Sequence, residues 1–586
     1  MPFFILALIV SVIGVLPLAV AGKLRAAAIV TPFATAVTWG IFYRFPPDLV
    51  NPFWGGLGFI TALYSALSAG AVIMDGQDRK PQLSGSWPQP KMGRQSKVKY
   101  VLPASLPTVI VVCLLVRWIG STPMFRSADY AAMLGEVQSR VWTQDVQPKD
   151  PQHVRKVPEA YASWVANKQL GAADSALGSQ YELDTEHMTV QMVRGEIWFV
   201  VPLKFKDWGT WRAKETAPGF IMVSAEDPNR EAVSVFDRQY AYMPSAYFGN
   251  ELARHLWTHG YSDKRLSDFT FEVDEENRGW WVVTVTHPTV GWSADRVDGV
   301  VIVNPTDGSF TYRALGDVPK WVDRVMPASL MESYMAWRGE YAAGWLNSWF
   351  SEVNLTQPED LTFVHGSDDE PYFVADITSI NDKDDALLGL MYVNARDGRT
   401  TYYKAKGVTS RAALQAVNAK ISYKKWSGQS PVLYNMYGTM ADIIPLIAEN
   451  STYQGVAIVN IAKPQDVAIG TDMTEALREY QKLLSVGSDP APELAMKTRT
   501  LTGIVLRFSR DDGDHGSVYY VLLKDGKTIF TSGGELSPKL PLTREGDTVT
   551  LTYVDSGEAV EPLLSFDNSS IRLDGVMPKR AAPDKR

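Results

Sequence analysis

Four long apolar segments within the first 120 residues constrain the fold of this chain most strongly. They cover residues 3–21, 26–43, 53–74 and 101–119, and each approaches the roughly 20 residues that a helix needs to cross a bilayer. Because the bilayer core offers no water to backbone amides, such segments cross it as helices. Residues 1–120 are therefore predicted to form a four-helix transmembrane anchor, with the lipid bilayer as its partner.

The charges of the loops between these segments predict their orientation. The third loop, within residues 75–100, carries six Lys or Arg residues and two acids, whereas the second loop has one Arg and one Asp. Loops rich in Lys and Arg stay in the cytoplasm. The N-terminus and everything after Ile119 are therefore expected outside it. This places the chain in a cell (inner) membrane, with the basic loop 75–100 cytoplasmic.

The first segment has a second interpretation, as a cleaved signal peptide, because Ala19-Val20-Ala21 resembles a small-residue cleavage site. A secretory signal carries its basic residues before the apolar run, and here Lys23 and Arg25 follow it. Retention of the segment is therefore favoured. Either interpretation leaves the C-terminal region outside the cytoplasm.

The spans themselves favour an anchor over a transporter. No Asp, Glu, Lys or His lies deep within them, so no relay for protons or ions is indicated. Small residues between Gly55 and Gly70 in the third span favour close helix packing, either within the chain or between copies in a homo-oligomer.

Charge divides the chain into two parts. Residues 1–120 hold ten Lys or Arg and three acids, a net charge of +7, and the remaining 47 basic and 62 acidic residues give 121–586 a net charge of −15. An acidic region repels phosphate backbones, so nucleic acid is disfavoured as a partner. The only cysteine, Cys113, lies in the fourth span, which excludes disulfides and cysteine-based sites from the soluble region.

Residues 121–194 are interpreted as a helical connector, because Ala131, Leu134, Val137 and Val141 have helical spacing. The chain then repeats itself over 195–485. Four segments each show two successive strands, and the second strand begins at a glycine and ends in Val-Asn or Val-Ser before a tight turn. The glycines are Gly219, Gly299, Gly389 and Gly455, and helices are predicted at 250–259, 330–350, 411–421 and 474–484.

This combination of a helix, a strand hairpin and an Asx-Gly turn resembles the PepSY-type module, a small extracytoplasmic α+β domain. The stretch that carries the resemblance best starts at Phe269, continues through Trp280 and ends at the turn Asp307-Gly308. PepSY-type modules are linked to the restraint of peptidases and to envelope proteins, and they have no catalytic residues. The resemblance therefore implies tandem binding or structural modules over 195–485.

A linker at 486–497 separates this array from a last unit at 498–575. Short strands are expected there at 501–508, 518–524, 528–531, 548–554 and 570–573, divided by turns that contain glycine. Five short strands in this length are typical of an OB-like small β-barrel, which we expect to serve protein contact or oligomerisation. Residues 576–586 are predicted to be a disordered tail.

Glu251, His255 and His259 are the candidate metal ligands, because they share one face of a predicted helix at four-residue spacing. Two histidines four residues apart can bind zinc together. A metalloprotease requires a glutamate between its two histidines, whereas Glu251 precedes both. Gly260 indicates a helix end, where the dipole favours His259. The two histidines are therefore interpreted as helix-surface residues, and no cofactor is predicted.

Other catalytic patterns are missing or incomplete. The acidic runs 274–276, 368–370, 381–385 and 511–514 lack the spacing of a calcium loop and lie where turns are expected. There is no Gly-x-Ser-x-Gly and no phosphate-binding glycine loop. Ser422–Lys425 matches Ser-x-x-Lys without the companion motifs of penicillin-binding enzymes.

The sequence as a whole predicts a membrane-anchored α+β protein that acts as a non-enzymatic scaffold for envelope proteins, within a secretion, conjugation or assembly machine. The alternative is an envelope enzyme, or a regulator of a peptidase or peptidoglycan enzyme. Metal binding or turnover by the purified soluble region would distinguish the two.

Overall fold

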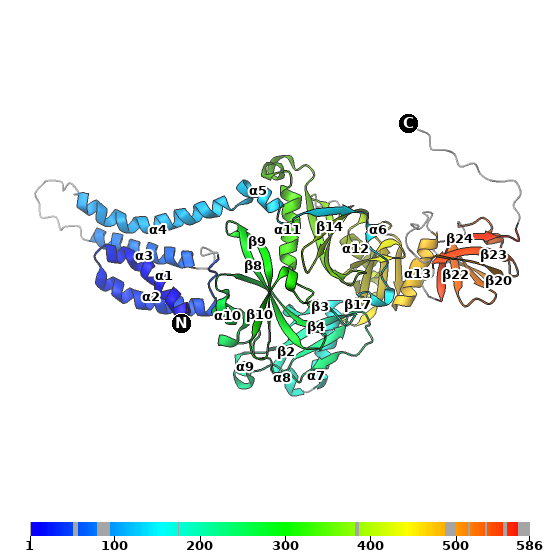
Figure 1. Ribbon diagram of the computed structural model, residues 1–586, viewed down its shortest axis with the longest axis horizontal. Helices are drawn as coiled ribbons and strands as arrows, with labels where there is room; N and C mark the ends of the chain where they lie inside the picture. The colour runs from blue at the N-terminus through cyan, green and yellow to red at the C-terminus, as the bar shows by residue number, and fades with distance from the viewer. Residues whose placement is uncertain are drawn as a thin grey trace, which may run out of the picture.

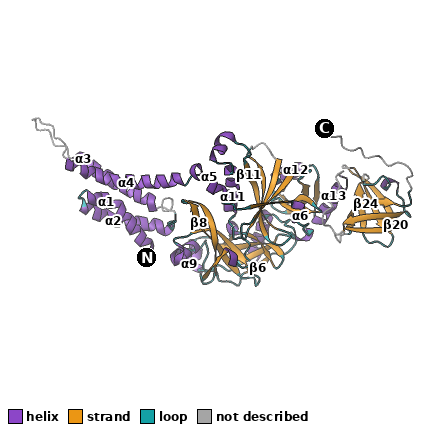
Figure 2. Ribbon diagram, turned by 45° about the horizontal axis from the view of Figure 1, so that its top comes forward, coloured by secondary structure: helices purple, strands orange, loops and turns teal. Residues whose placement is uncertain are grey.

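The fold is described from a computed structural model, which covers residues 2–50, 57–78, 94–173, 175–380, 386–486, 498–513, 516–533, 536–554 and 559–571. Figure 1 shows three parts in a row. Helices lie at one end, a region of sheets lies in the centre, and a small sheet lies at the opposite end. Helices and strands are both abundant, so the mixed helix and sheet class is confirmed (Figure 2).

The N-terminal part contains four helices, α1 (Pro2–Val20), α2 (Leu24–Arg44), α3 (Leu57–Asp78) and α4 (Arg94–Gly120). Among the described residues, α1 and α2 are long and apolar enough to cross a membrane. In α3 the apolar stretch is shorter, Leu57–Val72. The end of α4, Thr108–Gly120, reaches membrane length only together with α5 (Pro123–Ala131), across a 44° bend. Two apolar N-terminal helices therefore support association with a membrane.

The central part consists of four units, each a helix followed by an antiparallel meander of four strands. Unit 1 holds α7 (Glu159–Ala173), β3 (Thr189–Val193), β4 (Glu196–Phe205), β5 (Phe220–Ser224) and β6 (Val233–Val235). Unit 2 holds α10 (Leu252–Leu256), β7 (Arg265–Val273), β8 (Gly279–Val290), β9 (Ser293–Val303) and β10 (Phe310–Ala314). Unit 3 holds α11 (Ala328–Tyr341), β11 (Thr356–His365), β12 (Pro371–Ser379), β13 (Ala386–Asn394) and β14 (Thr400–Val408). Unit 4 holds α12 (Ser410–Ile421), β16 (Val432–Met436), β17 (Thr439–Ala448), β18 (Tyr453–Asn460) and β19 (Val467–Gly470).

The predicted two-strand repeats are the central hairpins of these meanders. Strand pairs β4–β5, β8–β9, β12–β13 and β17–β18 are all antiparallel, as their hydrophobic pattern and turns indicate. Each hairpin's second strand is followed by a turn, and in units 2 and 3 the first side chain of that turn caps backbone amides. Asn394 Oδ1 accepts from the Arg396 amide at 2.9 Å, and Asn304 Oδ1 accepts from the Thr306 amide at 3.0 Å. The shared Val-Asn pattern therefore encodes a shared turn.

At three of the four repeated glycines a side chain would collide with the backbone of a neighbouring strand. At Gly455, within β18, φ is +148°, and a Cβ would lie 2.2 Å from the carbonyl oxygen of Gly470 on β19. At Gly219, just before β5, φ is +145°, and a Cβ would lie 1.9 Å from the carbonyl oxygen of Val235 on β6. Gly299, with φ +159°, makes the same close approach to β10, and only glycine adopts such conformations without strain. Gly389 differs, because its φ is not positive and a Cβ there would meet the side chain of Tyr402.

Two of the second strands begin earlier than expected. Strand β9 starts at Ser293 and β13 at Ala386, before the glycines at which they were predicted to begin.

Hydrophobic cores join consecutive units. One core contains Val201 of unit 1 together with Phe271 and Trp281 of unit 2. A second core joins units 2 and 3, and a third joins units 3 and 4. Because each meander shares its core with the next, the four units form a continuous array.

The connector differs from the prediction. Helix α5 ends at Ala131, and Val137–Arg140 form strand β1, which pairs in parallel with β14. Gly135, three residues past the C-cap Ala132, has φ +76° and lies in the loop that leads from α5 into β1. The edge of β14 offers backbone hydrogen bonds to residues 137–140, whose apolar spacing had predicted a helix. Strands β2 (Tyr181–Leu183) and β3 also fall within 121–194, which is therefore only partly helical.

The C-terminal part contains β20 (Thr498–Gly513), β21 (Gly516–Leu523), β22 (Ile529–Gly533), β23 (Thr548–Val554) and β24 (Val560–Asn568). The pairing order β20-β21-β22-β24-β23 returns to β20. The fifth strand is β24, and of the strand expected at 570–573, residues 570 and 571 follow the end of β24 while 572 and 573 lie outside the described residues. Pro562 lies within β24, where it pairs in parallel with Thr531 on β22, next to a register shift between β24 and β23.

Unit 2 contacts the N-terminal helices directly. The rings of Trp257 and Phe3 stack at 4.5 Å, and Trp257 Nε1 donates to the carbonyl of Pro47 at 3.0 Å. Arg254 Nε donates to the carbonyl of Tyr43 at 3.0 Å. The start of α1 and the end of α2 therefore lie on the same side of the helices as the central units.

Candidate functional site

A cavity of about 730 Å³ lies where the connector crosses units 2 and 3. The connector lines it from Met133 to Gln147, unit 2 contributes Arg296 and Leu315, and the turns and strands of unit 3 form the rest. The parallel pairing of β1 with β14 positions the connector over this part of unit 3. The cavity therefore depends on three segments that are distant in the sequence.

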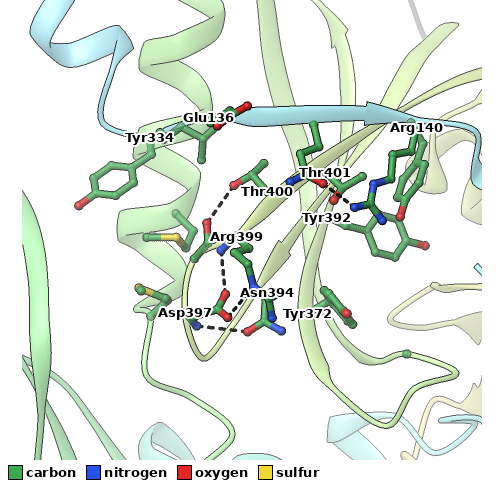
Figure 3. Close-up of a pocket in the computed structure, with 18 of the residues that line it drawn as sticks. Glu136, Arg140, Tyr334, Tyr372, Tyr392, Asn394, Asp397, Arg399, Thr400 and Thr401 are labelled. Carbon is green, nitrogen blue, oxygen red and sulfur yellow. Dashed lines mark hydrogen bonds and ion pairs between the residues drawn. The ribbon is translucent and has the colours of Figure 1, made fainter. Parts of the chain in front are cut away.

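The tip of the β13–β14 hairpin, around Asp397, divides the cavity into two sides (Figure 3). On one side, Tyr334 of α11 and the methionines Met133, Met326 and Met331 give an apolar wall. The other side is polar and is formed by one face of the unit 3 sheet. Its residues are Gln138 and Arg140 on β1, Thr401 and Tyr403 on β14, Tyr392 and Asn394 on β13, and Tyr372 on β12.

The charges of the polar side neutralise one another. Arg140 Nη1 lies 3.0 Å from Asp145 Oδ1, and Arg399 Nε lies 2.7 Å from Asp397 Oδ2. Both pairs are partly exposed, and such pairs contribute little to stability. They leave the wall polar and close to neutral, with arginine side chains that can contact a ligand.

The tyrosine hydroxyls of the polar side each take part in a hydrogen bond. The Tyr372 hydroxyl donates to Asp368 Oδ2 at 2.7 Å, and the Tyr403 hydroxyl donates to Asp145. Trp142 Nε1 donates to the Tyr392 hydroxyl at 3.3 Å. Burial raises the pKa of all three phenols above the usual tyrosine range, and the acceptor carboxylates add to the rise at Tyr372 and Tyr403. The phenols therefore stay neutral.

Carboxylates and hydroxyls are the reactive groups of the cavity. Among the described residues that line it there is no His, Cys or Lys. The carboxylates of Asp145, Asp368 and Asp397 are each engaged by an arginine or a tyrosine hydroxyl, and Glu136 also lines the cavity. The hydroxyls bound to a carboxylate are those of Tyr372 and Tyr403, and their raised pKa values keep them neutral.

The candidate metal ligands Glu251, His255 and His259 each have a protein partner. Glu251 caps α10 and accepts from the amides of Ala253 and Arg254 at 3.1 and 3.0 Å. His255 Nε2 donates to the carbonyl of Gly308 at 2.8 Å, and His259 Nδ1 donates to the carbonyl of His255 at 2.7 Å.

The prediction that both histidines are helix-surface residues is wrong for His255. It is buried and packs on Tyr242, with ring centres 4.6 Å apart. Burial also lowers its pKa, so it stays neutral. The hairpin of unit 2 covers it, a tertiary contact that helical spacing does not reveal.

A different group, Asp184, Glu186 and His187, brings three ligand atoms within 4.8 Å of one another, where a metal ion would fit. It was not predicted from the sequence, although Asp-x-Glu-His in a short turn is a signal for such a cluster. His187 Nδ1 already lies 2.8 Å from Asp184 Oδ2, and Glu186 is exposed. This ion pair accounts for two of the three residues without a metal.

Buried carboxyl groups lie where units 1, 2 and 3 meet. Glu272 on β7 accepts from the Asp323 amide at 2.7 Å and from the Thr270 hydroxyl at 3.1 Å. Asp323 Oδ2 in turn accepts from the Met192 amide on β3 at 2.8 Å and lies 2.8 Å from His365 Nε2 on β11. Burial, and then the charge of Asp323, raise the pKa of Glu272 to about 8. This network holds the units in register.

A second pair of buried carboxyl groups joins units 3 and 4. Asp376 Oδ2 accepts from the Ser410 amide at 2.6 Å, and the Ser410 hydroxyl lies 3.3 Å from Asp442 Oδ1. Burial raises the pKa of Asp376 to about 6 and that of Asp442 well above its usual value. Neither pair lines the cavity between the connector and units 2 and 3.

The chain matches no protein-family model and no curated protein. Its function is therefore inferred from the geometry of its own residues.

Proposed function

We propose that this chain is a multi-span membrane protein whose extracytoplasmic region is a non-enzymatic scaffold for other proteins of the cell envelope. The observation that carries this proposal is the cavity between the connector and units 2 and 3, with its tyrosines, its paired charges and, among its described residues, no His, Cys or Lys. Tyrosine and arginine are enriched at the energetic centres of protein interfaces. Such a wall suits recognition of a polypeptide segment.

The proposal includes α3 and α4 as the third and fourth spans, in an inner membrane. It is supported by the seat of unit 2 on the start of α1 and the end of α2, which puts the N-terminus and the central units on one side. With four spans, the basic loop 75–100 falls on the other side, where basic loops stay. PepSY-like units and an OB-like C-terminal unit are part of the same proposal, supported by the repeated helix-and-meander order and by the C-terminal strand order that returns to β20.

Reporter fusions test the orientation. Alkaline phosphatase fused after Ser121 is expected to be active, because the fusion point lies outside the cytoplasm. The same enzyme fused at Gly85 is expected to be inactive, and green fluorescent protein at each point provides the matched control with opposite behaviour. Phosphatase activity at Gly85 and fluorescence after Ser121 would reverse the orientation.

Photocrosslinking tests the binding role. A benzoylphenylalanine in place of Tyr372 is expected to form an adduct with a defined envelope protein in intact cells, because this side chain lines the cavity. The same group in place of Tyr423, which is 77% exposed on unit 4, is the control. Arg399→Glu reverses an exposed charge of the cavity wall and is expected to reduce the Tyr372 adduct at least fivefold.

Three outcomes would contradict the scaffold proposal. The first is equal adducts at positions 372 and 423, and the second is an adduct insensitive to Arg399→Glu. The third is turnover of peptides or peptidoglycan by the purified protein that is lost in the same variant, which would favour the enzyme alternative.

A further inference from the structure

The segment after α11 projects apolar side chains into solvent. Leu346, Trp349, Phe350 and Val353 are 66, 66, 76 and 56% exposed. The rings of Trp345 and Trp349 lie 5.6 Å apart, and those of Trp349 and Phe350 lie 6.5 Å apart. The side chains of residues 345–353 therefore form one aromatic cluster, the apolar tip.

The composition of the apolar tip suits a lipid interface. The only charged residue of the apolar tip is the exposed Glu352 near its end, and the polar residues Asn347, Ser348 and Ser351 are small and neutral. Tryptophan prefers the interfacial layer of a bilayer, where its ring is apolar and its N–H stays hydrated. Apolar clusters exposed to this extent mark interaction sites.

The tip lies beside the point where the chain leaves the helices. The ring of Tyr130 on α5 contacts Trp337 and Tyr341 on α11, at 4.8 and 6.3 Å. Figures 1 and 2 both show the end of α11 beside α5, which continues from α4. The tip is thus held next to a membrane-length apolar pair of helices.

Exposed apolar side chains continue across the bend between those two helices. Trp118 and Ile119 at the end of α4 are each 45% exposed, and Met124 and Phe125 on α5 are 52 and 59% exposed. This apolar surface leads from the spanning part of α4 toward the apolar tip. A lipid surface that covers α4 is therefore continuous with the place where the tip projects.

We infer that the apolar tip inserts into the outer interface of the same bilayer that the N-terminal helices enter. The inference rests on the orientation given under the proposed function. The occupant of this surface is phospholipid, and the contact adds a third attachment of the central units to the membrane, besides the seat of unit 2 and the covalent link through α4 and α5. Such an attachment fixes the tilt of the units, since a body held at separated points cannot rotate freely over the membrane.

Spin-label accessibility in the full-length protein tests the inference. The background variant is Cys113→Ser, and single cysteines are introduced as Phe350→Cys or Tyr423→Cys and labelled with a nitroxide. The protein is placed in nanodiscs of phosphatidylcholine and phosphatidylglycerol (3:1). A nitroxide on the native Cys113, which is exposed within α4, gives the reference value for a lipid-facing position. A nitroxide at position 423 gives the reference value for a position in water.

Oxygen partitions into lipid, and a nickel chelate stays in water. The ratio of oxygen to nickel collisions at position 350 is expected to resemble that at Cys113 and to exceed that at position 423 severalfold. A ratio at position 350 equal to that at 423 would overturn the inference. Protection of position 350 from both reagents would also overturn it, because a second copy or a partner protein would then cover the tip. Both substituted side chains are more than 70% exposed, so neither variant disturbs folding.

Discussion

Replacing Gly455 by alanine is expected to destabilise unit 4 strongly, although it adds only one methyl group. The added Cβ would lie 2.2 Å from the carbonyl oxygen of Gly470, which belongs to the backbone of β19 and cannot rotate away. The conformation, φ +148°, adds strain of its own. Overpacking and backbone strain together cost roughly 3–5 kcal/mol. The melting temperature of the unit should fall by about 10 °C or more.

Intrinsic tryptophan fluorescence during heating of the full-length protein in detergent provides the measurement. Gly316→Ala is the matched control, because a Cβ at this position meets no atom within 4 Å and φ is not positive. Proteolysis of the heated Gly455→Ala variant should cut first within residues 410–470. Equal melting temperatures for the two variants would show that the glycine does not hold β18 against β19.

Raising the pH from 5 to 9 is expected to destabilise the junction of units 1, 2 and 3 through Glu272. This side chain is 1% exposed, and its pKa is raised from 4.5 to about 8 by burial and by the neighbouring Asp323. The other polar groups that face the junction are Arg324, Thr270 and His365. The ionised form is therefore the costly form in the folded state.

The direction of the effect follows from proton binding. Between pH 4.5 and about 8 the folded protein holds a proton on Glu272 that the unfolded chain has lost. The contribution of Glu272 to stability is therefore greatest below pH 4.5 and falls as the pH rises through the window, by on the order of 5 kcal/mol at most. Asp376, with its pKa raised to about 6, acts in the same direction but only below that pH.

Glu272→Gln isolates the contribution of this group. Glutamine keeps the shape of the side chain without a charge, so the variant should melt higher than the parent at pH 8–9 and should lose most of the slope above pH 6. Glu275→Gln, an exposed position two residues past β7, is the matched control and should retain the slope. A parent melting temperature that is constant from pH 6 to 9 would contradict the role given to the buried acid.

Much of the architecture follows from local patterns in the sequence. The apolar run of α1 and α2, the hairpins marked by Gly219, Gly299 and Gly455, and the helix at 411–421 were all predicted from residues adjacent in the chain. These elements have strong local signals, because periodicity, glycine and capping residues act over a few residues.

The cavity between the connector and units 2 and 3 could not be predicted from local sequence patterns. Tyr372, Tyr392 and Tyr403 lie on three strands, and Arg140 comes from a segment more than 200 residues earlier that was interpreted as a helix. Strand β1 exists because the edge of β14 offers it backbone hydrogen bonds. His255 shows the same limit, since the hairpin that buries it is supplied by residues 308–310.

The sequence by itself determined the apolar N-terminal helices and the order of the repeated units. Each of these depends on hydrophobicity, turn residues or composition, which are properties of short stretches of chain. Only the tertiary structure decided which edge the connector joins, which carboxyl groups become buried and which aromatic residues project beside α5. Those outcomes depend on contacts between distant segments, and their free energies arise only after the units have packed together.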